Sequence, residues 1–206
     1  MLRVALTGGI ATGKSHVLAE CRRRGVPCLD ADELAHGVMA NGTEASAAIA
    51  TRFGADILKD DGAVDRRKLA PIVFADAAAR RDLEAIVHPA VYRAIAAGLR
   101  AFELTETSSI AIVDVPLLFE SGRAHDFDCV VATVCSLRRQ RDRLAARGLS
   151  QTEIDDRLAA QWSAERKAAC ADYVISTDGS YDETDAAIVA TLAQLRGRAA
   201  VGREVR

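Results

Sequence analysis

The stretch Gly8-Gly9-Ile10-Ala11-Thr12-Gly13-Lys14-Ser15 decides the fold class of this chain. It fits the phosphate-loop pattern G-x-x-x-x-G-K-[ST] at every fixed position. A short apolar run, residues 2–7, precedes it, and a helix-type segment begins at Gly13. In such loops backbone N–H groups surround the β-phosphate, and glycines allow a close approach that side chains would block. The sequence therefore predicts a nucleoside triphosphate site between a strand and a helix.

Within this loop, individual side chains have expected roles. We expect Lys14 to reach the β- and γ-phosphates and the Ser15 hydroxyl to bind Mg²⁺. The positive end of the following helix adds to the field that attracts the phosphates. The residues that we expect to contact the nucleotide here are Gly9, Ile10, Ala11, Thr12, Gly13, Lys14, Ser15 and His16.

Strands and helices alternate along most of the chain. Five apolar runs have the length and composition of strands, at residues 2–7, 26–29, 110–115, 129–134 and 173–176. A strand, a helix and a second strand before Asp30 are typical of a βαβ unit in a parallel sheet. We therefore expect an α/β fold of the P-loop kinase type, with a doubly wound parallel sheet, an inserted helical substrate domain and a helical lid.

The helical segment between the second and third strands, residues 33–107, is too long for a simple crossover. We expect it to form the inserted subdomain that binds the acceptor substrate. Turn and breaker residues predict interruptions at Asn41-Gly42, at Asp60-Asp61-Gly62 and at Pro71, and a kink at Pro89. The other expected parts are a nucleotide-binding core of residues 1–32, 108–136 and 169–196, a lid of residues 137–168 and a frayed tail of residues 197–206.

Composition excludes several classes of protein. The chain has 206 residues, a formal charge of −2 and 50% hydrophobic residues, which excludes a disordered chain and a broad basic surface for nucleic acid or membrane. We find no transmembrane or signal-peptide pattern. The five cysteines include no C-x-x-C pair, so we expect reduced thiols, a cytoplasmic location and no zinc site. The oligomeric state stays open, with a monomer as the default.

The phosphate loop alone does not identify the reaction. The chain has a single asparagine, Asn41, so the N-K-x-D motif by which Ras-type GTPases recognise guanine is absent. The L-S-G-G-Q motif of transporter ATPases is absent as well. Small-molecule kinases remain the main class, and they need a second substrate site and arginines on a lid.

Four carboxylates follow predicted strands and are candidates for chemistry. Asp30 and Asp32 follow the second strand, at the sheet edge where ligands bind. Either could accept a proton from an attacking hydroxyl or hold a metal-bound water. Alternatively, Asp32 only caps the helix that starts at Glu33, and a merely structural role of this kind is also an alternative for Asp30. Asp114 ends the third strand, where a carboxylate near Mg²⁺ is expected. Glu120 either reaches the acceptor or only begins a helix.

Two further groups have open interpretations. Arg139, Arg143 and Arg147 recur every four residues and predict one basic helical face, which is either solvated or reaches the triphosphate. His88 precedes Pro89 and is interpreted as a hydrogen-bonded histidine at a kink, with contact to the acceptor as the alternative.

Several motifs, taken in order, resemble those of dephospho-coenzyme A kinases. Besides the phosphate loop, the similar segments are Asp30-Ala31-Asp32, residues 83–89, 114–120, 148–150, 157–161 and 171–179. The resemblance implies ATP-dependent phosphorylation of the ribose 3′-hydroxyl of dephospho-coenzyme A, the last step of coenzyme A synthesis. ATP and dephospho-coenzyme A are then the expected partners, and Mg²⁺ is the expected cofactor. A different small-molecule kinase and a non-catalytic ATP-dependent switch stay open as alternatives.

The resemblance also implies roles for particular residues. Asp32 corresponds to the favoured base candidate, and Arg143 and Arg147 align with the lid arginines. The chain departs from the family at Ala11, where glycine is usual, at His16, where threonine is common, and at Ser176-Thr177-Asp178, where asparagine-containing sequences are usual. We expect the loop to tolerate the Ala11 methyl group if φ at that residue is negative. The residues assigned to function are therefore Lys14, Asp32 and Arg143 for catalysis, Arg147 with the loop for the nucleotide, Asp32, His88 and Glu120 for the acceptor, and Ser15 and Asp114 for the metal.

Overall fold

The computed structural model describes residues 1–204, and the chain divides into two compact units. Unit 1 contains the chain before Leu29 and after Arg100, and unit 2 is Leu29–Arg100. The predicted acceptor segment, residues 33–107, overlaps unit 2 over most of its length. Its role in acceptor binding stays a prediction.

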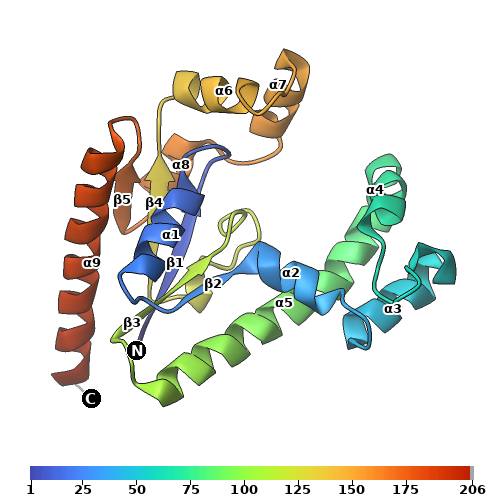
Figure 1. The fold of residues 1–206 in the computed structure, drawn as a ribbon, viewed down its shortest axis with the longest axis horizontal. Helices are drawn as coiled ribbons and strands as arrows, with labels where there is room; N and C mark the ends of the chain where they lie inside the picture. Colours follow the sequence, from blue (N-terminus) through green and yellow to red (C-terminus); the bar gives the residue numbers. More distant parts are fainter. Residues whose placement is uncertain (205–206) are drawn as a thin grey trace. The chain divides into compact units, whose positions relative to one another are not determined.

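A five-stranded sheet carries the nucleotide-binding part of the fold (Figure 1). Its strands are β1 (Leu2–Gly8), β2 (Cys28–Asp30), β3 (Ile110–Asp114), β4 (Cys129–Val134) and β5 (Tyr173–Ser176), in the order β2-β3-β1-β4-β5. β1 pairs in parallel with both β3 and β4, and β4 pairs in parallel with β5. The predicted α/β class with a parallel sheet is confirmed. The central position of β1 brings the loop after it next to the ends of β3 and β4, which is where ligands bind in such sheets.

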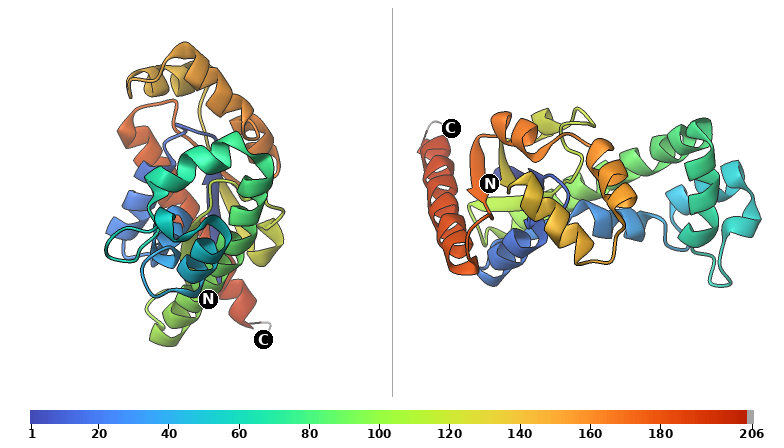
Figure 2. Two further views of the ribbon diagram at one scale, coloured as in Figure 1. Left: turned by 90° about the vertical axis from the view of Figure 1, so that its right-hand side faces the viewer. Right: turned by 90° about the horizontal axis from the view of Figure 1, so that it is seen from above.

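Helices α1 (Lys14–Arg23) and α9 (Tyr181–Glu204) pack against each other and against the sheet (Figure 1, Figure 2). Their buried side chains, among them Val17 and Ile188, join Val4 and Leu6 of β1 in one apolar core. Burying each such aliphatic side chain stabilises the fold by roughly 1.5–3 kcal/mol. Helix α1 is thereby held firmly at the end of the phosphate loop.

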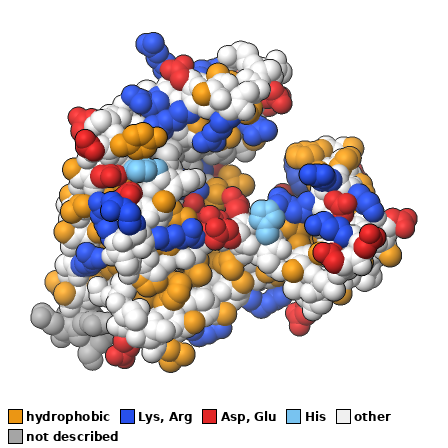
Figure 3. All heavy atoms as spheres, viewed as in Figure 1, with side chains coloured by type: hydrophobic (Ala, Val, Ile, Leu, Met, Phe, Trp, Pro, Cys, Tyr) orange, Lys and Arg blue, Asp and Glu red, His pale blue; other side chains and the backbone are white. Residues whose placement is uncertain are grey.

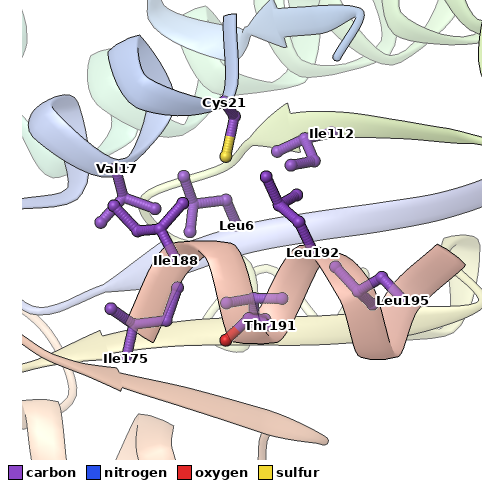
Figure 4. A pocket seen from close by; sticks show the side chains of 10 residues that line it. Leu6, Val17, Cys21, Ile112, Ile175, Ile188, Thr191, Leu192 and Leu195 are labelled. Atoms are coloured by element: carbon purple, nitrogen blue, oxygen red, sulfur yellow. The ribbon is translucent and has the colours of Figure 1, made fainter. Parts of the chain in front are cut away.

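Between α1, α9 and the sheet, apolar side chains surround a small void (Figure 4). Its volume is about 10 Å³, which is at the lower limit for one water molecule. The lining residues are Leu6, Val17, Cys21, Ile112, Val131, Ile175, Ile188, Thr191, Leu192 and Leu195. The void is a packing gap of the core, too small for a substrate.

The closing helix is longer than predicted. Residues 197–204 of the expected frayed tail belong to α9, and positions 205–206 lie outside the described residues. Ala199 is buried in the core, and Arg198 donates a hydrogen bond of 2.8 Å to the Asp128 carbonyl. The tail expectation was wrong because tertiary packing stabilises a helix beyond the point where its sequence stops favouring it.

Three short helices follow β4 in the range expected to form the lid. Helices α6 (Leu137–Ala145) and α7 (Gln151–Ala159) pack against each other, whereas α8 (Ala164–Ala169) packs against β1 and β4. A capping box begins α7: Ser150 and Glu153 exchange side-chain and backbone hydrogen bonds. Basic side chains gather over the α6–α7 segment (Figure 3).

Helix α6 ends before the predicted basic face is complete. Gly148 has φ +84°, and the Leu149 N–H donates to the Leu144 carbonyl at 3.4 Å, which is the pattern of a Schellman helix end. Arg147 therefore lies beyond α6 and is exposed. The prediction of one helical face with three arginines was wrong for Arg147, because the left-handed glycine stops the helix first.

Unit 2 is helical and has a core of its own. It contains α2 (Ala31–Val38), α3 (Glu44–Phe53), α4 (Arg66–Ala75) and most of α5 (Ala77–Thr105). The core comprises Met39, Ile49, Ile57, Val64 and Leu69, with partly buried side chains packed against them. This separate core explains why the segment folds as a compact unit rather than as a long crossover.

The predicted interruptions of this unit are partly confirmed. Asn41-Gly42 and Asp60-Asp61-Gly62 lie outside the helices, as expected. Pro71, by contrast, lies inside α4, so the break predicted there was wrong. Helix α5 contains Pro89, in agreement with the predicted long helical segment, and the kink at Pro89 stays a prediction. A proline removes one helix donor, and Pro71 is exposed, so water can satisfy the carbonyl that loses its partner.

No helix within residues 1–204 combines the length and apolar content that a membrane crossing requires. All five cysteines lie in this range and are free thiols, of which Cys170 is exposed.

Candidate nucleotide site

The phosphate loop joins β1 to α1 and ends in a left-handed glycine. Gly13 has φ +84° and is the N-cap of α1, so its carbonyl accepts hydrogen bonds from the N–H groups of His16 and Val17. The N–H groups of Gly13, Lys14 and Ser15 precede these first helical donors. Helix geometry leaves such N–H groups without a partner inside the helix. Together with the positive end of the helix dipole they form a site for an anion.

Ala11 adopts a backbone conformation that alanine rarely takes. Its φ is +59°, and among the described residues other than glycine only Glu106 shares a positive φ. The condition of a negative φ, under which we expected the loop to tolerate the Ala11 methyl group, is therefore not met. A left-handed conformation costs an L-residue roughly 1–2 kcal/mol, so interactions elsewhere must hold Ala11 in place.

Arg143 of α6 supplies part of this restraint. Its Nη1 donates to the Ala11 carbonyl at 2.9 Å and to Thr177 Oγ1 at 3.1 Å, and its Nη2 donates to the Thr177 carbonyl at 2.9 Å. Thr177 Oγ1 in turn donates to the Thr12 carbonyl at 2.8 Å. The structure thus places Arg143 against the Ala11 carbonyl of the phosphate loop and against Thr177, and its contact with a triphosphate stays a prediction.

Lys14 and Asp114 form an ion pair beside the loop. Lys14 Nζ lies 2.6 Å from each carboxylate oxygen of Asp114, and Asp114 is 3% exposed. The pairing of Leu6 with Asp114 in the β1–β3 register brings the two residues together. Ser15, the next residue of α1, is exposed. The predicted catalytic lysine and the predicted metal-binding aspartate are therefore neighbours.

A metal ion at this place would need ligands from outside the protein. Within residues 1–204 no group of three or more His, Cys, Asp and Glu side chains is placed to hold a metal. Mg²⁺ bound with nucleotides uses one or two protein oxygens and takes its other ligands from phosphates and water. The carboxylate of Asp114 and the exposed hydroxyl of Ser15 fit this kind of site.

A buried cation, Lys167 of α8, lies near the start of the loop, and sequence reasoning missed it. Lys167 is 0% exposed and donates to Glu120 Oε1 at 2.9 Å, to the Pro116 carbonyl at 2.7 Å and to the Gly8 carbonyl at 3.5 Å. Burial lowers the pKa of its ammonium, and the hydrogen bond to Glu120 opposes that effect. One signal in the sequence could have pointed to Lys167: lysine is rare in this chain, with only four lysines among the 27 basic residues.

Glu120 is held by this cation and by the backbone of the α7–α8 connection. Its Oε1 also accepts a hydrogen bond of 2.9 Å from the Trp162 N–H. Its Oε2 is buried and has no hydrogen-bond partner among the residues that the structure describes. The Trp162 ring stacks on Phe119 with 5.9 Å between the ring centroids, so Trp162 packs against the neighbour of Glu120. Part of Glu120 is therefore structural, and its contact with an acceptor stays a prediction.

In unit 2, Asp30 rather than Asp32 caps α2. The Asp30 carboxylate accepts hydrogen bonds from the N–H groups of Asp32 at 2.8 Å and Glu33 at 3.2 Å. The alternative in which Asp32 caps this helix was therefore wrong, because the helix begins one residue before Asp32. Asp32 is exposed in the first turn of α2, and His88 is exposed in α5. Both side chains lie at the surface of the unit.

His16 follows Ser15 in α1 and contacts the first turn of α9. Its Nε2 lies 2.7 Å from Asp185 Oδ1, and its ring packs edge-on against Tyr181 at 4.9 Å between centroids. These contacts hold the start of α1 against the start of α9.

Comparison with known proteins identifies the family to which these motifs belong. The family model described as dephospho-CoA kinase matches residues 2–183. A dephospho-CoA kinase of Anaeromyxobacter dehalogenans is 46% identical over 198 residues, covering 94% of this chain and 92% of the relative. A dephospho-CoA kinase of Geobacillus kaustophilus is 41% identical over 194 residues, covering 94% and 96%.

Solved structures agree with this match. The crystal structure of TT1252 from Thermus thermophilus superposes with a TM-score of 0.79 at 33% identity, covering 94% of this chain and 97% of the other. A dephospho-CoA kinase from Campylobacter jejuni gives 0.71 at 26% identity, covering 95% and 97%. The family model, the sequence relatives and the shared fold lead to one conclusion: this chain belongs to the dephospho-CoA kinase family.

Proposed function

We propose that this chain transfers the γ-phosphoryl group of ATP to the ribose 3′-hydroxyl of dephospho-coenzyme A, giving coenzyme A and ADP. One observation carries the proposal at the site itself: Lys14, at the start of α1, lies 2.6 Å from the carboxylate oxygens of Asp114. A cation and a carboxylate in this relation are what a triphosphate and its metal need. Membership of the dephospho-CoA kinase family supports the choice of acceptor.

The phosphate loop binds the triphosphate in this proposal. The N–H groups at the start of α1 contact the β-phosphate, and the Lys14 ammonium bridges the β- and γ-phosphates. To do so Lys14 must release at least one oxygen of Asp114. The phosphates supply oxygens in exchange, so the lysine keeps charged partners throughout.

Mg²⁺ would be held by Ser15 Oγ and the Asp114 carboxylate, together with phosphate oxygens and water. When bound, the ion neutralises charge that develops on the β- and γ-phosphates. Asp114 then serves the lysine before the nucleotide binds and the metal afterwards. Its burial keeps the carboxylate fixed for both tasks.

Unit 2 contributes the acceptor side in this proposal. Asp32 orients the 3′-hydroxyl or accepts its proton. The capping of α2 by Asp30 supports this role, because the Asp32 carboxylate is not needed to satisfy the helix. His88 and Glu120 are the further residues that we assign to acceptor binding.

Arg143 and Arg147 differ in how many of their N–H groups the protein already uses. Arg147 is exposed beyond α6 and is free to approach the nucleotide when the α6–α7 segment moves. Arg143 uses three of its N–H groups on Ala11 and Thr177, which leaves the N–H of Nε and one of Nη2 for a phosphate oxygen. We assign both arginines to stabilising negative charge during transfer.

The test is a coupled assay of ADP release with a panel of acceptors at saturating MgATP. We expect turnover with dephospho-coenzyme A and background rates with nucleosides, nucleotides and pantetheine phosphates. Turnover with a nucleoside instead would indicate a different small-molecule kinase. Absence of turnover with every acceptor, despite ATP binding, would favour a non-catalytic switch.

The free thiols agree with a cytoplasmic location, which fractionation of the cells would check.

A further inference from the structure

Thr177 is one of the residues outside the phosphate loop that restrain its backbone. Thr177 follows β5 and is 4% exposed, and its N–H donates to the Val134 carbonyl at 2.9 Å, which fixes its backbone to the sheet. Its hydroxyl accepts from Arg143 Nη1 and donates to the Thr12 carbonyl at 2.8 Å. A Cβ atom at Gly13 would lie 3.2 Å from Thr177, so the two residues are also in close contact.

The hydrogen bond from Thr177 to the Thr12 carbonyl also orients the Gly13 N–H, which belongs to the same peptide group. A peptide group is planar, and its C=O and N–H point in opposite directions. Holding the Thr12 carbonyl therefore sets the direction of the Gly13 N–H. That N–H is the first of the three at the start of α1 for which the helix supplies no partner.

The bond from Arg143 to the Ala11 carbonyl acts on the adjoining peptide. Ala11 is the strained residue of the loop, with φ +59°. Two successive carbonyls, of Ala11 and Thr12, are thus held by a chain of hydrogen bonds that runs through Arg143 and Thr177. A strained conformation persists when its surroundings over-determine it, and these bonds do so here.

We propose that Thr177 is a positioning residue of the phosphate loop: through its hydroxyl it holds the Thr12 carbonyl, and with Arg143 it keeps the Ala11–Gly13 segment in the conformation that receives the triphosphate. Thr177 does not touch the phosphates itself. The inference rests on the proposed function only in that the loop binds a triphosphate, and it does not depend on the acceptor.

The experiment measures binding of tripolyphosphate, in the presence of Mg²⁺, by titration calorimetry. Thr177→Val removes the hydroxyl at nearly constant volume, and Thr177→Ser keeps it. Thr191→Val is the matched control, because Thr191 is buried in α9 and its hydroxyl donates only to the Ala187 carbonyl of its own helix at 2.9 Å. Thr177→Val removes both hydrogen bonds of the hydroxyl, to Arg143 and to the Thr12 carbonyl, and we expect it to weaken binding about 10-fold or more. Both other variants should bind within about twofold of the wild type.

A second variant separates positioning from general loss of structure. Ala11→Gly removes the steric cost of a positive φ, so the loop needs less restraint. We expect the Ala11→Gly/Thr177→Val protein to bind tripolyphosphate more tightly than Thr177→Val alone. Binding by a folded Thr177→Val protein within twofold of the wild type would overturn the proposal, and so would the absence of any recovery in the double variant. Neither readout involves dephospho-coenzyme A, so failure of the acceptor assay leaves this test intact.

Discussion

Lys14 Nζ lies 2.6 Å from both carboxylate oxygens of Asp114, in a pair whose side chains are 15% and 4% exposed. Lys14, which we expect to bind the phosphates, is thus held by a carboxylate in this structure. The bond also keeps the buried carboxylate compensated, so the pair serves both stability and function. Removing one partner therefore has two separable consequences.

Lys14→Ala should lower kcat by at least about 10³-fold, because a charge contact in a closed site contributes several kcal/mol to transition-state stabilisation. It should also lower the free energy of unfolding by roughly 3 kcal/mol, because Asp114 is left buried without its ammonium partner. Steady-state kinetics and urea unfolding measure the two effects.

The Lys14→Ala/Asp114→Asn protein is the control that separates them. Removing the buried charge should restore most of the lost stability while activity stays low. Recovery of activity together with stability would mean that Lys14 acts only in folding.

Asp32→Asn should lower activity and leave stability almost unchanged, whereas Asp30→Ala should lower stability. Asp32→Asn should lower kcat by about 10²-fold or more, as expected for a group that orients or deprotonates a hydroxyl, with little change in melting temperature. Asp30→Ala removes the cap of α2 and should cost about 1 kcal/mol of stability. An active Asp32→Asn enzyme would remove Asp32 from the mechanism.

Ala11→Gly should stabilise the protein. Relief of the positive φ gains roughly 1–2 kcal/mol, and the greater freedom of glycine in the unfolded chain takes back about 0.5–1 kcal/mol. The net gain corresponds to a rise of roughly 2 °C in melting temperature. Ala19→Gly, at an exposed position of α1, is the matched control and should lower the melting temperature. Equal effects of the two substitutions would contradict the strain at Ala11.

The strands and the loop were predictable because their signals are local. The runs 129–134 and 173–176 coincide with β4 and β5, and the glycine pattern of residues 8–15 gives the strand–loop–helix unit. Apolar residues in short runs, with glycine at fixed spacing, permit few other structures.

The features that sequence reasoning missed depend on contacts between distant residues. The positive φ of Ala11 needs Arg143, which is 132 positions away, and burial of Lys167 needs Glu120. Helix α4 continues through Pro71 because this residue lies at the surface, where water can satisfy the carbonyl that loses its donor. The sequence around Pro71 does not indicate that it is exposed. Composition and spacing carry no information on such pairings.

Alkaline pH should destabilise the protein through its buried thiols. Burial raises the pKa of Cys28 to about 12 and those of Cys21 and Cys129 to about 11, from an ordinary value of 9.0. A folded-state pKa above the unfolded one means that stability is fully present below pH 9 and is lost as pH rises toward 11–12. Lys167 opposes this trend, because its lowered pKa adds stability as pH approaches 10.5. It is one group against four thiols, since burial also raises the pKa of Cys135.

Urea unfolding at pH 8, 9 and 10 measures the loss, for which each thiol contributes at most about 1.4 kcal/mol per pH unit. A protein with alanine at these three positions should show a flatter dependence on pH. An unchanged slope would show that other groups cause the alkaline loss.

The central claim is transfer of the γ-phosphoryl group to one hydroxyl of dephospho-coenzyme A. The most direct measurement incubates the enzyme and Mg²⁺ with ATP labelled in its γ-phosphate, and with either dephospho-coenzyme A or its 3′-deoxy analogue. The account predicts label in coenzyme A with the true acceptor and none in the analogue, with ADP formed in equal amount to the labelled product. Labelling of the 3′-deoxy analogue, or no labelling of dephospho-coenzyme A by folded enzyme that binds ATP, would contradict it.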